Sequence, residues 1–436
     1  MLCTITNRRL CEMSIRDLNL EIVPYINYIF AIIFILCVGY QFMYIFVPFL
    51  KRGRKLKTKQ MLKYAVLIPA RNEEKVIPHL IASLKGQTYP SDLIDIFVIA
   101  DNCTDNTAGV SKDAGAFEVI VRNNKKVVGK GHALDYALAY IREKYPDNDY
   151  AGYFVFDADN LLDEHYIEEM NKMFSNGKRI ITSYRNTKNY GTSWVSAGGS
   201  LWYLRESRFL NHSRTLLDTS CAISGTGFLV HREVLEKVGG WKFFLLTEDI
   251  EFTLHHVLEG ECIAYCDKAV LYDEQPVKFS QSWRQRMRWT KGSMQVTQKY
   301  FFKMVKGIFT GKGFACFDLA VSTMIPLILT IISFIMYVVF IALGIIFRLD
   351  GMNELVRSLL EMLFNSYFML LGIGSVTVIS EWSKIFAPVH KKILYTFTFP
   401  FFMLSYIPIT IVALFSRNVK WKPIDHNQVK TLDDVR

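Results

Sequence analysis

Apolar residues are distributed very unevenly along the chain, and their pattern predicts how the molecule is divided. An uncharged apolar run covers residues 22–50 and exceeds the roughly 20 residues that a helix needs to span a bilayer. Three further runs, at residues 319–347, 363–380 and 393–415, are each compatible with a spanning helix. Residues 63–300 between them have the composition of a globular domain. The pattern therefore predicts a folded domain inserted between transmembrane helices.

Basic residues directly follow the first apolar run, within residues 51–62: Lys51, Arg52, Arg54, Lys55, Lys57 and Lys59. By the positive-inside rule, this flank of a multi-pass cell-membrane protein is cytoplasmic, which places residues 1–21 outside and the central domain in the cytoplasm. Three later crossings would leave the tail, residues 416–436, outside, yet the tail begins with basic residues that favour the inside. Pro400 and Pro408 permit a broken last helix, so both positions of the tail stay open.

The overall charge and the cysteine pattern limit the range of partners. The formal net charge of +10 requires no nucleic acid, because a basic flank attracts anionic membrane lipids and the chain has no nucleic-acid recognition motif. Eight cysteines form no Cys-x-x-Cys pair and nine histidines show no metal-ligand spacing, so no zinc site is predicted. In a cytoplasmic domain the cysteines are expected to be reduced thiols.

The start of the central domain alternates between strand and helix patterns. Residues 64–69 fit a strand, a helical pattern follows through Leu84, and residues 94–100 fit a second strand. Short connections between these elements predict a parallel α/β sheet. In such sheets ligands bind beyond the carboxyl ends of the strands, where the polar loops at Arg71 and at residues 101–105 are expected.

A further strand pattern, at residues 152–156, ends in Asp157-Ala158-Asp159. Side chains two apart on a strand point to the same face, so both carboxylates are expected at one place. Divalent cations such as Mg²⁺ and Mn²⁺ prefer oxygen ligands, and Mg²⁺ is usually held by one or two carboxylates together with substrate phosphates. The motif therefore predicts a nucleotide diphosphate site, although such aspartates also cap helices.

A phosphate contact is predicted between the strand patterns at residues 94–100 and 152–156. Residues 117–121 fit a third strand, which leads into Gly129-Lys130-Gly131-His132 and a helix at residues 133–140. A lysine in a glycine-flanked loop just before a helix suits a phosphate, because both the ammonium group and the amino-terminal amides of the helix favour anions.

Five motifs occur in order along the chain: Pro69-Ala70-Arg71-Asn72-Glu73, Asp101 to Asp105, Asp157-Ala158-Asp159, Thr247-Glu248-Asp249 and Gln285-Arg286-Met287-Arg288-Trp289. Together they resemble the membrane-embedded family 2 glycosyltransferases, a group that includes cellulose, hyaluronan and poly-N-acetylglucosamine synthases and many bacterial exopolysaccharide glycosyltransferases. The resemblance covers residues 62–296 by motif and the apolar runs by layout. It implies a GT-A fold, the Rossmann-like α/β domain of nucleotide-diphospho-sugar transferases, inserted between transmembrane helices.

The resemblance also implies roles around a nucleotide-sugar donor. Asp159 would coordinate Mg²⁺ or Mn²⁺ directly, and Asp157 would contact the nucleotide ribose or metal-bound water. Asp101 matches the family's uridine-binding aspartate, although Ala100 stands where many relatives carry a second aspartate. The other implied nucleotide-binding residues are Pro69, Arg71 and Glu73 around the base and Lys130 beside the phosphates.

Asp249 is the residue that the resemblance implies as general base. It would take the proton from the acceptor hydroxyl as that group attacks the anomeric carbon in line with the departing diphosphate. One direct displacement inverts the anomeric centre, so an α-linked donor would give a β-glycoside. Thr247, read alone, also fits an ordinary helix cap.

The remaining motif residues would contact the diphosphate or the acceptor. An arginine such as Arg288 can meet phosphate oxygens with two parallel hydrogen bonds, and the indole of Trp289 offers an apolar face to a sugar ring; Gln285 belongs to the same motif. Small residues at Ser224, Gly225 and Thr226 would let an acceptor sugar approach the backbone, with Glu248 beside it. Residues 283–309 also fit a basic amphipathic helix on the membrane surface, and residues 301–318 are expected to form an interfacial helix.

These features predict a transferase that moves sugar from a nucleotide diphosphate donor, a UDP-sugar, to a growing β-linked exopolysaccharide. An alternative within the enzyme class is a transferase that adds one sugar to a polyprenyl-linked or glycolipid acceptor. A third interpretation is a glycan-export scaffold that has kept the fold and lost the chemistry. The intact motifs argue against the scaffold, and donor hydrolysis separates it from both enzymes because a scaffold would release no nucleoside diphosphate.

Overall fold

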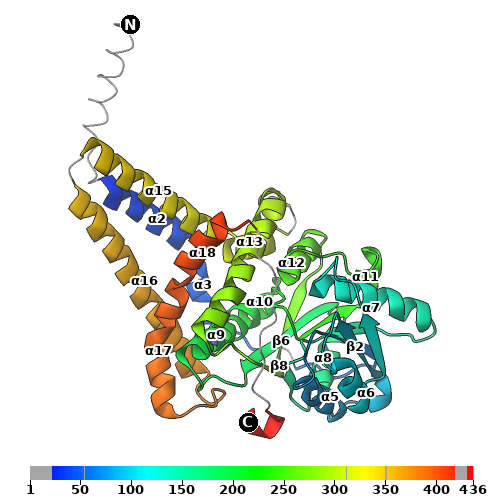
Figure 1. The fold of residues 1–436 in the computed structure, drawn as a ribbon. Helices are drawn as coiled ribbons and strands as arrows, with labels where there is room; N and C mark the ends of the chain where they lie inside the picture. Colours follow the sequence, from blue (N-terminus) through cyan, green and yellow to red (C-terminus); the bar gives the residue numbers. More distant parts are fainter. Residues whose placement is uncertain (1–21, 54, 311, 349–350, 418–429, 436) are drawn as a thin grey trace, which may run out of the picture.

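The computed structural model describes residues 22–435 except 54, 311, 349–350 and 418–429. The predicted tail at residues 1–21 and most of the tail at residues 416–436 lie outside the described residues. The described chain forms an α/β domain with a group of long apolar helices to one side of it (Figure 1). The predicted division into a central domain and flanking apolar helices therefore agrees with the arrangement of the elements.

An eight-stranded mixed sheet lies at the centre of the domain, in the order β3-β2-β1-β4-β7-β6-β8-β5. Strands β3, β2, β1 and β4 are parallel, as the sequence predicts, whereas β7 is antiparallel to both β4 and β6. The strands are β1 (Tyr64–Ala70), β2 (Ile94–Asp101), β3 (Glu118–Arg122), β4 (Gly152–Val155), β5 (Leu161–Leu162), β6 (Ile180–Thr187), β7 (Phe228–His231) and β8 (Ile263–Asp273).

Helices cover both faces of this sheet, which explains why its first strands are almost wholly apolar. In β1, Val66 and Ile68 face one core, and Ala65 and Leu67 face the other, as the alternation of side chains along a strand requires. The first core is closed by α5 (Ile77–Lys85), α6 (Thr107–Asp113) and α8 (Tyr166–Phe174). The second is closed by α7 (Lys130–Lys144), α9 (Trp194–Arg205) and α12 (Glu248–Leu258).

A 30-residue helix, α13 (Phe279–Ile308), leads from the domain towards the apolar helices. The predicted single helix at residues 301–318 is wrong, because α13 runs to Ile308 and a separate helix, α14 (Gly313–Thr323), begins after a break. The remaining short elements are a 3₁₀ turn (Ser91–Leu93), a π-helical turn (Glu206–Asn211), α10 (His212–Leu216), α11 (Arg232–Lys237) and a 3₁₀ turn (Leu432–Val435).

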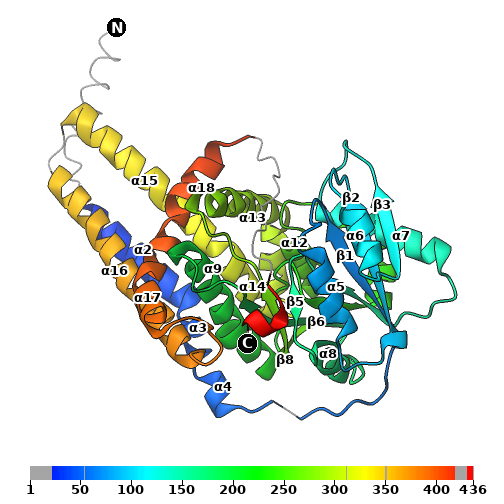
Figure 2. The same cartoon turned by 60° about the horizontal axis from the view of Figure 1, so that its bottom comes forward.

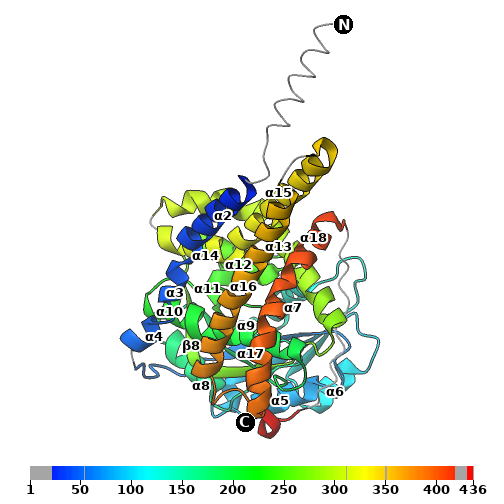
Figure 3. The same cartoon turned by 90° about the vertical axis from the view of Figure 1, so that its left-hand side faces the viewer.

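Three of the described helical segments are long and apolar enough to cross a membrane: α15 (Ile325–Phe347), α16 (Met352–Ser380), and the pair α17 (Val389–Leu404) and α18 (Tyr406–Phe415). Figures 2 and 3 show α16 and α17 side by side. Helix α15 begins at Ile325, later than residue 319, where the predicted run begins. The residues before it belong to α14, and Pro326 occupies the first turn of α15. Helix α16 begins at Met352, before its predicted start at residue 363. The charged residues there stay within the helix, because Arg357 pairs with Glu361 at 3.0 Å.

The first apolar run makes a possible fourth crossing, but it is bent rather than one straight helix. It consists of α2 (Ile22–Val38), α3 (Tyr40–Met43) and α4 (Val47–Leu50), with a bend of 43°. The bend falls at Gly39, a residue type that weakens a helix interior. Pro408 similarly explains the break between α17 and α18, because it has no N–H to donate to the carbonyl of Leu404.

A buried ion pair between α10 and α14 also holds the first apolar run in place. Arg214 of α10 donates to both carboxylate oxygens of Asp318 of α14, from Nε at 2.8 Å and Nη2 at 2.9 Å. The hydroxyls of Tyr40 and Tyr44 donate to the same carboxylate at 2.6 and 2.9 Å. Both charged side chains are almost completely buried, so three segments that are distant in sequence are held at one point.

Replacing Arg214 with methionine should lower the free energy of unfolding by about 3–5 kcal/mol, because the buried carboxylate of Asp318 loses its counter-charge. Thermal unfolding in detergent micelles measures the loss. Arg232→Met is a matched control, since Arg232 pairs with Asp149 at an exposed surface position and such pairs contribute at most about 1 kcal/mol. Equal effects of the two substitutions would show that the buried pair is not a structural anchor.

Candidate active site

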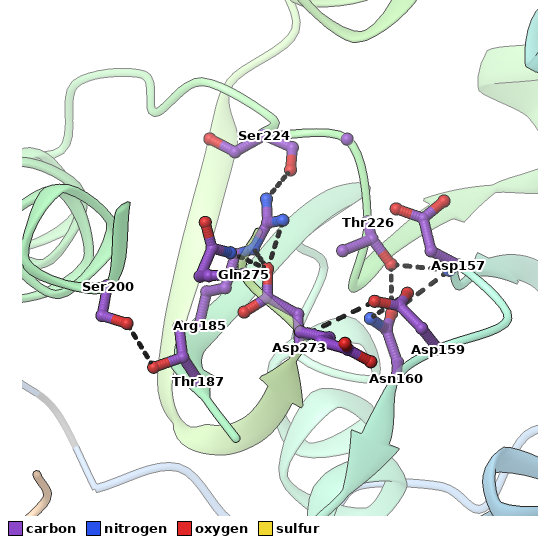
Figure 4. Close-up of polar contacts among 12 residues, drawn as sticks. Asp157, Asp159, Asn160, Arg185, Thr187, Ser200, Ser224, Thr226, Asp273 and Gln275 are labelled. Carbon is purple, nitrogen blue, oxygen red and sulfur yellow. Dashed lines mark hydrogen bonds and ion pairs between the residues drawn. The ribbon is translucent and has the colours of Figure 1, made fainter. Parts of the chain in front are cut away.

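The two aspartates of the Asp157-Ala158-Asp159 motif lie in a turn and not on the strand. Strand β4 ends at Val155, so the prediction from strand geometry is wrong. The backbone N–H of Asp157 donates instead to Thr226 Oγ1 at 2.9 Å and to Asn160 Oδ1 at 3.2 Å, as Figure 4 shows. Polar side chains outside the strand thus capture the backbone and end the ladder, yet both carboxylates still line one cavity.

Lys130 connects the first motif aspartate to the loop that was predicted to line the acceptor. It is the first residue of α7, and its ammonium group pairs with the carboxylate of Asp157 and donates to the carbonyl of Gly225 at 2.7 Å. Gly225 has φ +81°, a conformation that glycine adopts without strain. The ammonium group of Lys130 therefore joins three parts of the predicted site: the loop before α7, the Asp157-Ala158-Asp159 motif and the loop at Gly225.

The two predicted nucleotide loops are locked to each other by reciprocal hydrogen bonds. Asn72 Nδ2 donates to Thr104 Oγ1 at 3.0 Å, and Thr104 N donates back to Asn72 Oδ1 at 2.7 Å. Asp101 ends β2 and is buried, with Oδ1 paired to Arg122 at 2.5 Å. Its fixed carboxylate lines the cavity together with the other predicted nucleotide-binding residues, Pro69, Arg71, Glu73 and Lys130.

A further polar network, which the sequence patterns did not predict, binds the backbone at Ser224 and at Asp159. Arg185 of β6 pairs with Asp273 of β8 at 2.5 Å and donates to the carbonyl of Ser224 at 2.6 Å. Lys188 donates to the carbonyl of Asp159. Burial raises the pKa of Asp273 despite the neighbouring arginine. These residues lie on neighbouring strands but far apart in sequence, so no local motif could identify them.

Glu248 and Asp249 are the first two residues of helix α12, which begins close to Gly225. Thr247 occupies the N-cap position, but its side chain makes no capping hydrogen bond, so the alternative of an ordinary capping threonine is not supported. Asp249 Oδ1 accepts from the N–H of Ile250 at 2.9 Å, and Oδ2 lies 3.7 Å from the point where a methyl group on Gly225 would stand. The predicted base therefore lies beside the loop that carries Lys130 and Asp157.

The carboxyl groups of Glu248 and Asp249 both have pKa values above the usual values for glutamate and aspartate side chains. Burial, and then repulsion from Asp249, raise the pKa of Glu248 to about 7. Burial also raises the pKa of Asp249 above its usual range, while Lys130 and Arg288 oppose the rise. A raised pKa makes a carboxylate a stronger base near neutral pH. Glu251, one turn along, accepts from the N–H groups of Phe244 and Leu245 at 2.9 and 3.0 Å and fixes the preceding loop.

The motif on α13 presents two faces. Gln285, Arg288 and Trp289 line the cavity, and Arg288 Nη1 donates to the carbonyl of Leu246 at 3.0 Å, which ties it to the loop before the predicted base. Arg286 points the other way and is fully buried, where it donates to the carbonyl of Phe402 at 2.9 Å. The motif therefore joins the site to the apolar helices, a second role that its spacing did not reveal.

One cavity of about 1190 Å³ brings nearly all the predicted site residues together. Thr226 is the exception: it is buried beneath the loop and holds the backbone of Asp157, so its predicted place in the acceptor lining is wrong. The predicted residues that line the cavity are Pro69, Arg71, Glu73, Asp101, Lys130, Asp157, Asp159, Ser224, Gly225, Glu248, Asp249, Gln285, Arg288 and Trp289.

The Asp157-Ala158-Asp159 motif offers two carboxylates to a divalent cation, which is fewer ligands than such a cation binds in total. Within the described residues, no group of three or more histidine, cysteine, aspartate or glutamate side chains could hold a metal ion. Asp157 has a side chain that is 40% exposed to the cavity, and the carboxylate of Asp159 accepts a long hydrogen bond, 3.3 Å, from the N–H of Glu274. Two carboxylates fit the usual protein share of a Mg²⁺ or Mn²⁺ site that substrate phosphates complete.

Comparisons with known proteins identify the family of the central domain. The family model "Glycosyltransferase like family 2" matches residues 62–292. "Probable glycosyltransferase YdaM" of Bacillus subtilis is 27% identical over 263 residues, 56% of this chain and 59% of that protein. "Beta-monoglucosyldiacylglycerol synthase" of Nostoc sp. is 27% identical over 256 residues, 56% and 51% of the two chains. This chain thus spans little more than half the length of these curated relatives.

A solved structure shows the same fold. The mannosyltransferase PcManGT of Pyrobaculum calidifontis, in complex with GDP-Man and Mn²⁺, superposes with a TM-score of 0.54 at 16% identity and covers 89% of this chain and 99% of its own. The family model covers more than half of this chain, and the sheet, the helices and the cavity agree with it. The chain therefore belongs to the family 2 glycosyltransferases, nucleotide-sugar transferases whose catalytic domain has the GT-A fold.

Proposed function

We propose that this chain is an inverting transferase that moves a sugar from a nucleotide diphosphate donor, a UDP-sugar, to an acceptor hydroxyl. The observation that carries the proposal is the arrangement around Gly225. Lys130 ties this loop to Asp157, and Asp249 lies close to the same glycine. A sugar bound there would have its diphosphate near the motif and its anomeric carbon within reach of the base.

The residues would divide the reaction between leaving group and nucleophile. Lys130 and Arg288 supply fixed positive charge for the departing diphosphate, which stabilises charge that develops in the transition state. Asp249 accepts the proton of the attacking hydroxyl. Asp157 and Asp159 would hold Mg²⁺ or Mn²⁺, which when bound supplies further charge stabilisation at the diphosphate. Asp101 and the residues around Arg71 would position the nucleotide.

The site also argues against an inactive scaffold. Glu248 and Asp249 stand next to each other at the start of α12 with raised pKa values, an arrangement whose ionisation costs free energy and which a scaffold does not need. The basic flank at residues 51–62 supports a multi-pass arrangement in a cell membrane with the catalytic domain in the cytoplasm, where nucleotide sugars would reach it.

The configuration of the product tests the inversion. With a donor whose sugar is α-linked, the coupling constant of the anomeric proton in the isolated product, measured by NMR, should identify a β-glycoside. An α-glycoside would contradict a single displacement with Asp249 as base, because it requires retention.

The pH dependence of transfer should follow the carboxyl pair. Asp249 acts only when ionised, and its pKa is raised, so kcat should fall on lowering the pH while an ordinary aspartate would still be ionised. Replacing Glu248 with glutamine should leave this acidic limb in place, because Glu248, whose pKa is raised to about 7, is still protonated where Asp249 ionises. A pH–rate profile of both proteins measures the limb, and a shift of the limb in the variant would assign it to Glu248 instead of Asp249.

A further inference from the structure

The cavity continues from the predicted donor site into the membrane-type helices. We call this part the apolar lobe, and its wall includes Val38, Phe42, Leu327, Ile373, Val376 and Met403. These residues come from each of the described segments that are long and apolar enough to cross a membrane, including the bent first pair. The lobe therefore lies where the α/β domain meets the apolar helices.

No charged side chain lines the cavity from the described residues of α2, α3, α15, α16, α17 and α18. Its polar side chains are largely used within the protein: Thr330 donates to the carbonyl of Pro326 at 2.8 Å, and Gln41 donates to Ser322 at 3.0 Å. A sugar polymer carries hydroxyls on every unit, and moving them into this lining without partners would cost free energy. A hydrocarbon chain moves from the bilayer into it without losing hydrogen bonds.

The inner end of the same cavity is polar and reaches Asp249 and Gly225. The total volume of about 1190 Å³ exceeds the ~300–1,000 Å³ of ordinary small-molecule sites, so a second substrate has room beside the donor. An amphiphile requires this change from an apolar lobe to a polar end at Asp249, with its chains in the lobe and its head at the site.

We propose that the acceptor is a membrane lipid with a hydroxyl group in its head, which enters from the bilayer through the apolar lobe. This inference rests on the proposed function and selects the lipid acceptor over the growing polysaccharide. The lipid oxygen forms a bond to the anomeric carbon while the bond from that carbon to the diphosphate oxygen breaks. The hydroxyl proton passes to Asp249, and the nucleoside diphosphate leaves with the bonding electrons.

Lipid labelling tests the inference directly. The purified full chain is placed in phosphatidylcholine vesicles with or without dioleoylglycerol or phosphatidylglycerol, and supplied with a labelled donor that it cleaves. The expected result is label in the organic extract, with one defined sugar addition by mass spectrometry, only when a hydroxyl lipid is present. Label in a water-soluble polymer, or donor cleavage without any labelled lipid, would overturn the inference while leaving the proposed function intact; failure to cleave any donor would sink both.

A matched pair of tryptophan variants tests the lobe itself. Ile373→Trp fills the lobe and should raise the KM for the lipid about tenfold, equivalent to about 1.4 kcal/mol, while the affinity for the nucleotide diphosphate, measured by titration, stays the same. Ile379→Trp on the same helix is the control, since Ile379 is 73% exposed and lies outside the cavity lining. Equal lipid KM values for the two variants would show that the acceptor does not pass through the lobe.

Discussion

Replacing Asp249 with asparagine should lower kcat by about 10²–10⁴-fold, the range expected when a general base is removed. Asparagine keeps the shape of the side chain, so the hydrogen bond from the N–H of Ile250 can be kept by its amide oxygen. The affinity for the nucleotide should stay the same, because the nucleotide loops are anchored elsewhere. Steady-state transfer kinetics and a nucleotide titration on the same protein separate the two effects.

The control for this variant is Asp113→Asn, at the exposed end of α6, which should transfer sugar at the normal rate. A normal kcat in Asp249→Asn would exclude Asp249 as the base and would redirect attention to Glu248, the neighbouring carboxyl group that also lines the cavity. Loss of nucleotide affinity together with kcat would instead indicate that the substitution disturbs the start of α12.

The second large effect is expected at Asp159. Asp159→Asn should lower transfer by about 100-fold or more, because a divalent cation contributes several kcal/mol of charge stabilisation and each 1.36 kcal/mol is a factor of ten in rate. In the wild-type protein, EDTA should abolish transfer and added Mn²⁺ or Mg²⁺ should restore it. The variant should need a much higher Mn²⁺ concentration for half-maximal rate, which a metal titration of the initial rate measures.

Two results would contradict a metal role for the motif. Transfer that is unaffected by EDTA would show that no dissociable cation is needed. The same half-maximal Mn²⁺ concentration in the variant and in the wild-type protein would place the cation away from Asp159. Melting temperatures of both proteins show whether the turn that carries Asp159 is still folded.

The fold could be predicted from sequence because its signals are local. Strands β1 and β2 are buried on both faces and are therefore mostly apolar, and their ends lie within one residue of the predicted bounds. Helix α16 was predicted too short because Glu354 and Arg357 interrupt its apolar pattern, although Arg357 pairs within the helix. Residues 22–50 contain a bend that hydropathy does not record, since the bend depends on Gly39 and not on polarity.

The site could be predicted only where a motif carried it. The strand pattern places Asp157 and Asp159 on one face of a strand, whereas the strand ends at Val155 and Thr226 and Asn160 bind the backbone N–H of Asp157. Arg185 and Asp273 were missed because their contact depends on the pairing of β6 with β8, which join segments 88 residues apart. Local patterns identify residues that face a ligand more readily than the residues that hold them in place.

Nucleoside diphosphate release is the measurement that tests the central claim most directly. The purified chain in phosphatidylcholine nanodiscs with Mn²⁺ is given UDP-glucose, UDP-N-acetylglucosamine, UDP-galactose and GDP-mannose in turn, each with a hydroxyl lipid and with a short glycan as acceptor. An inverting nucleotide-sugar transferase should release diphosphate from at least one UDP-sugar, at a rate that falls strongly in Asp249→Asn. Release from no donor, or equal release by the variant, would contradict the function proposed for this site.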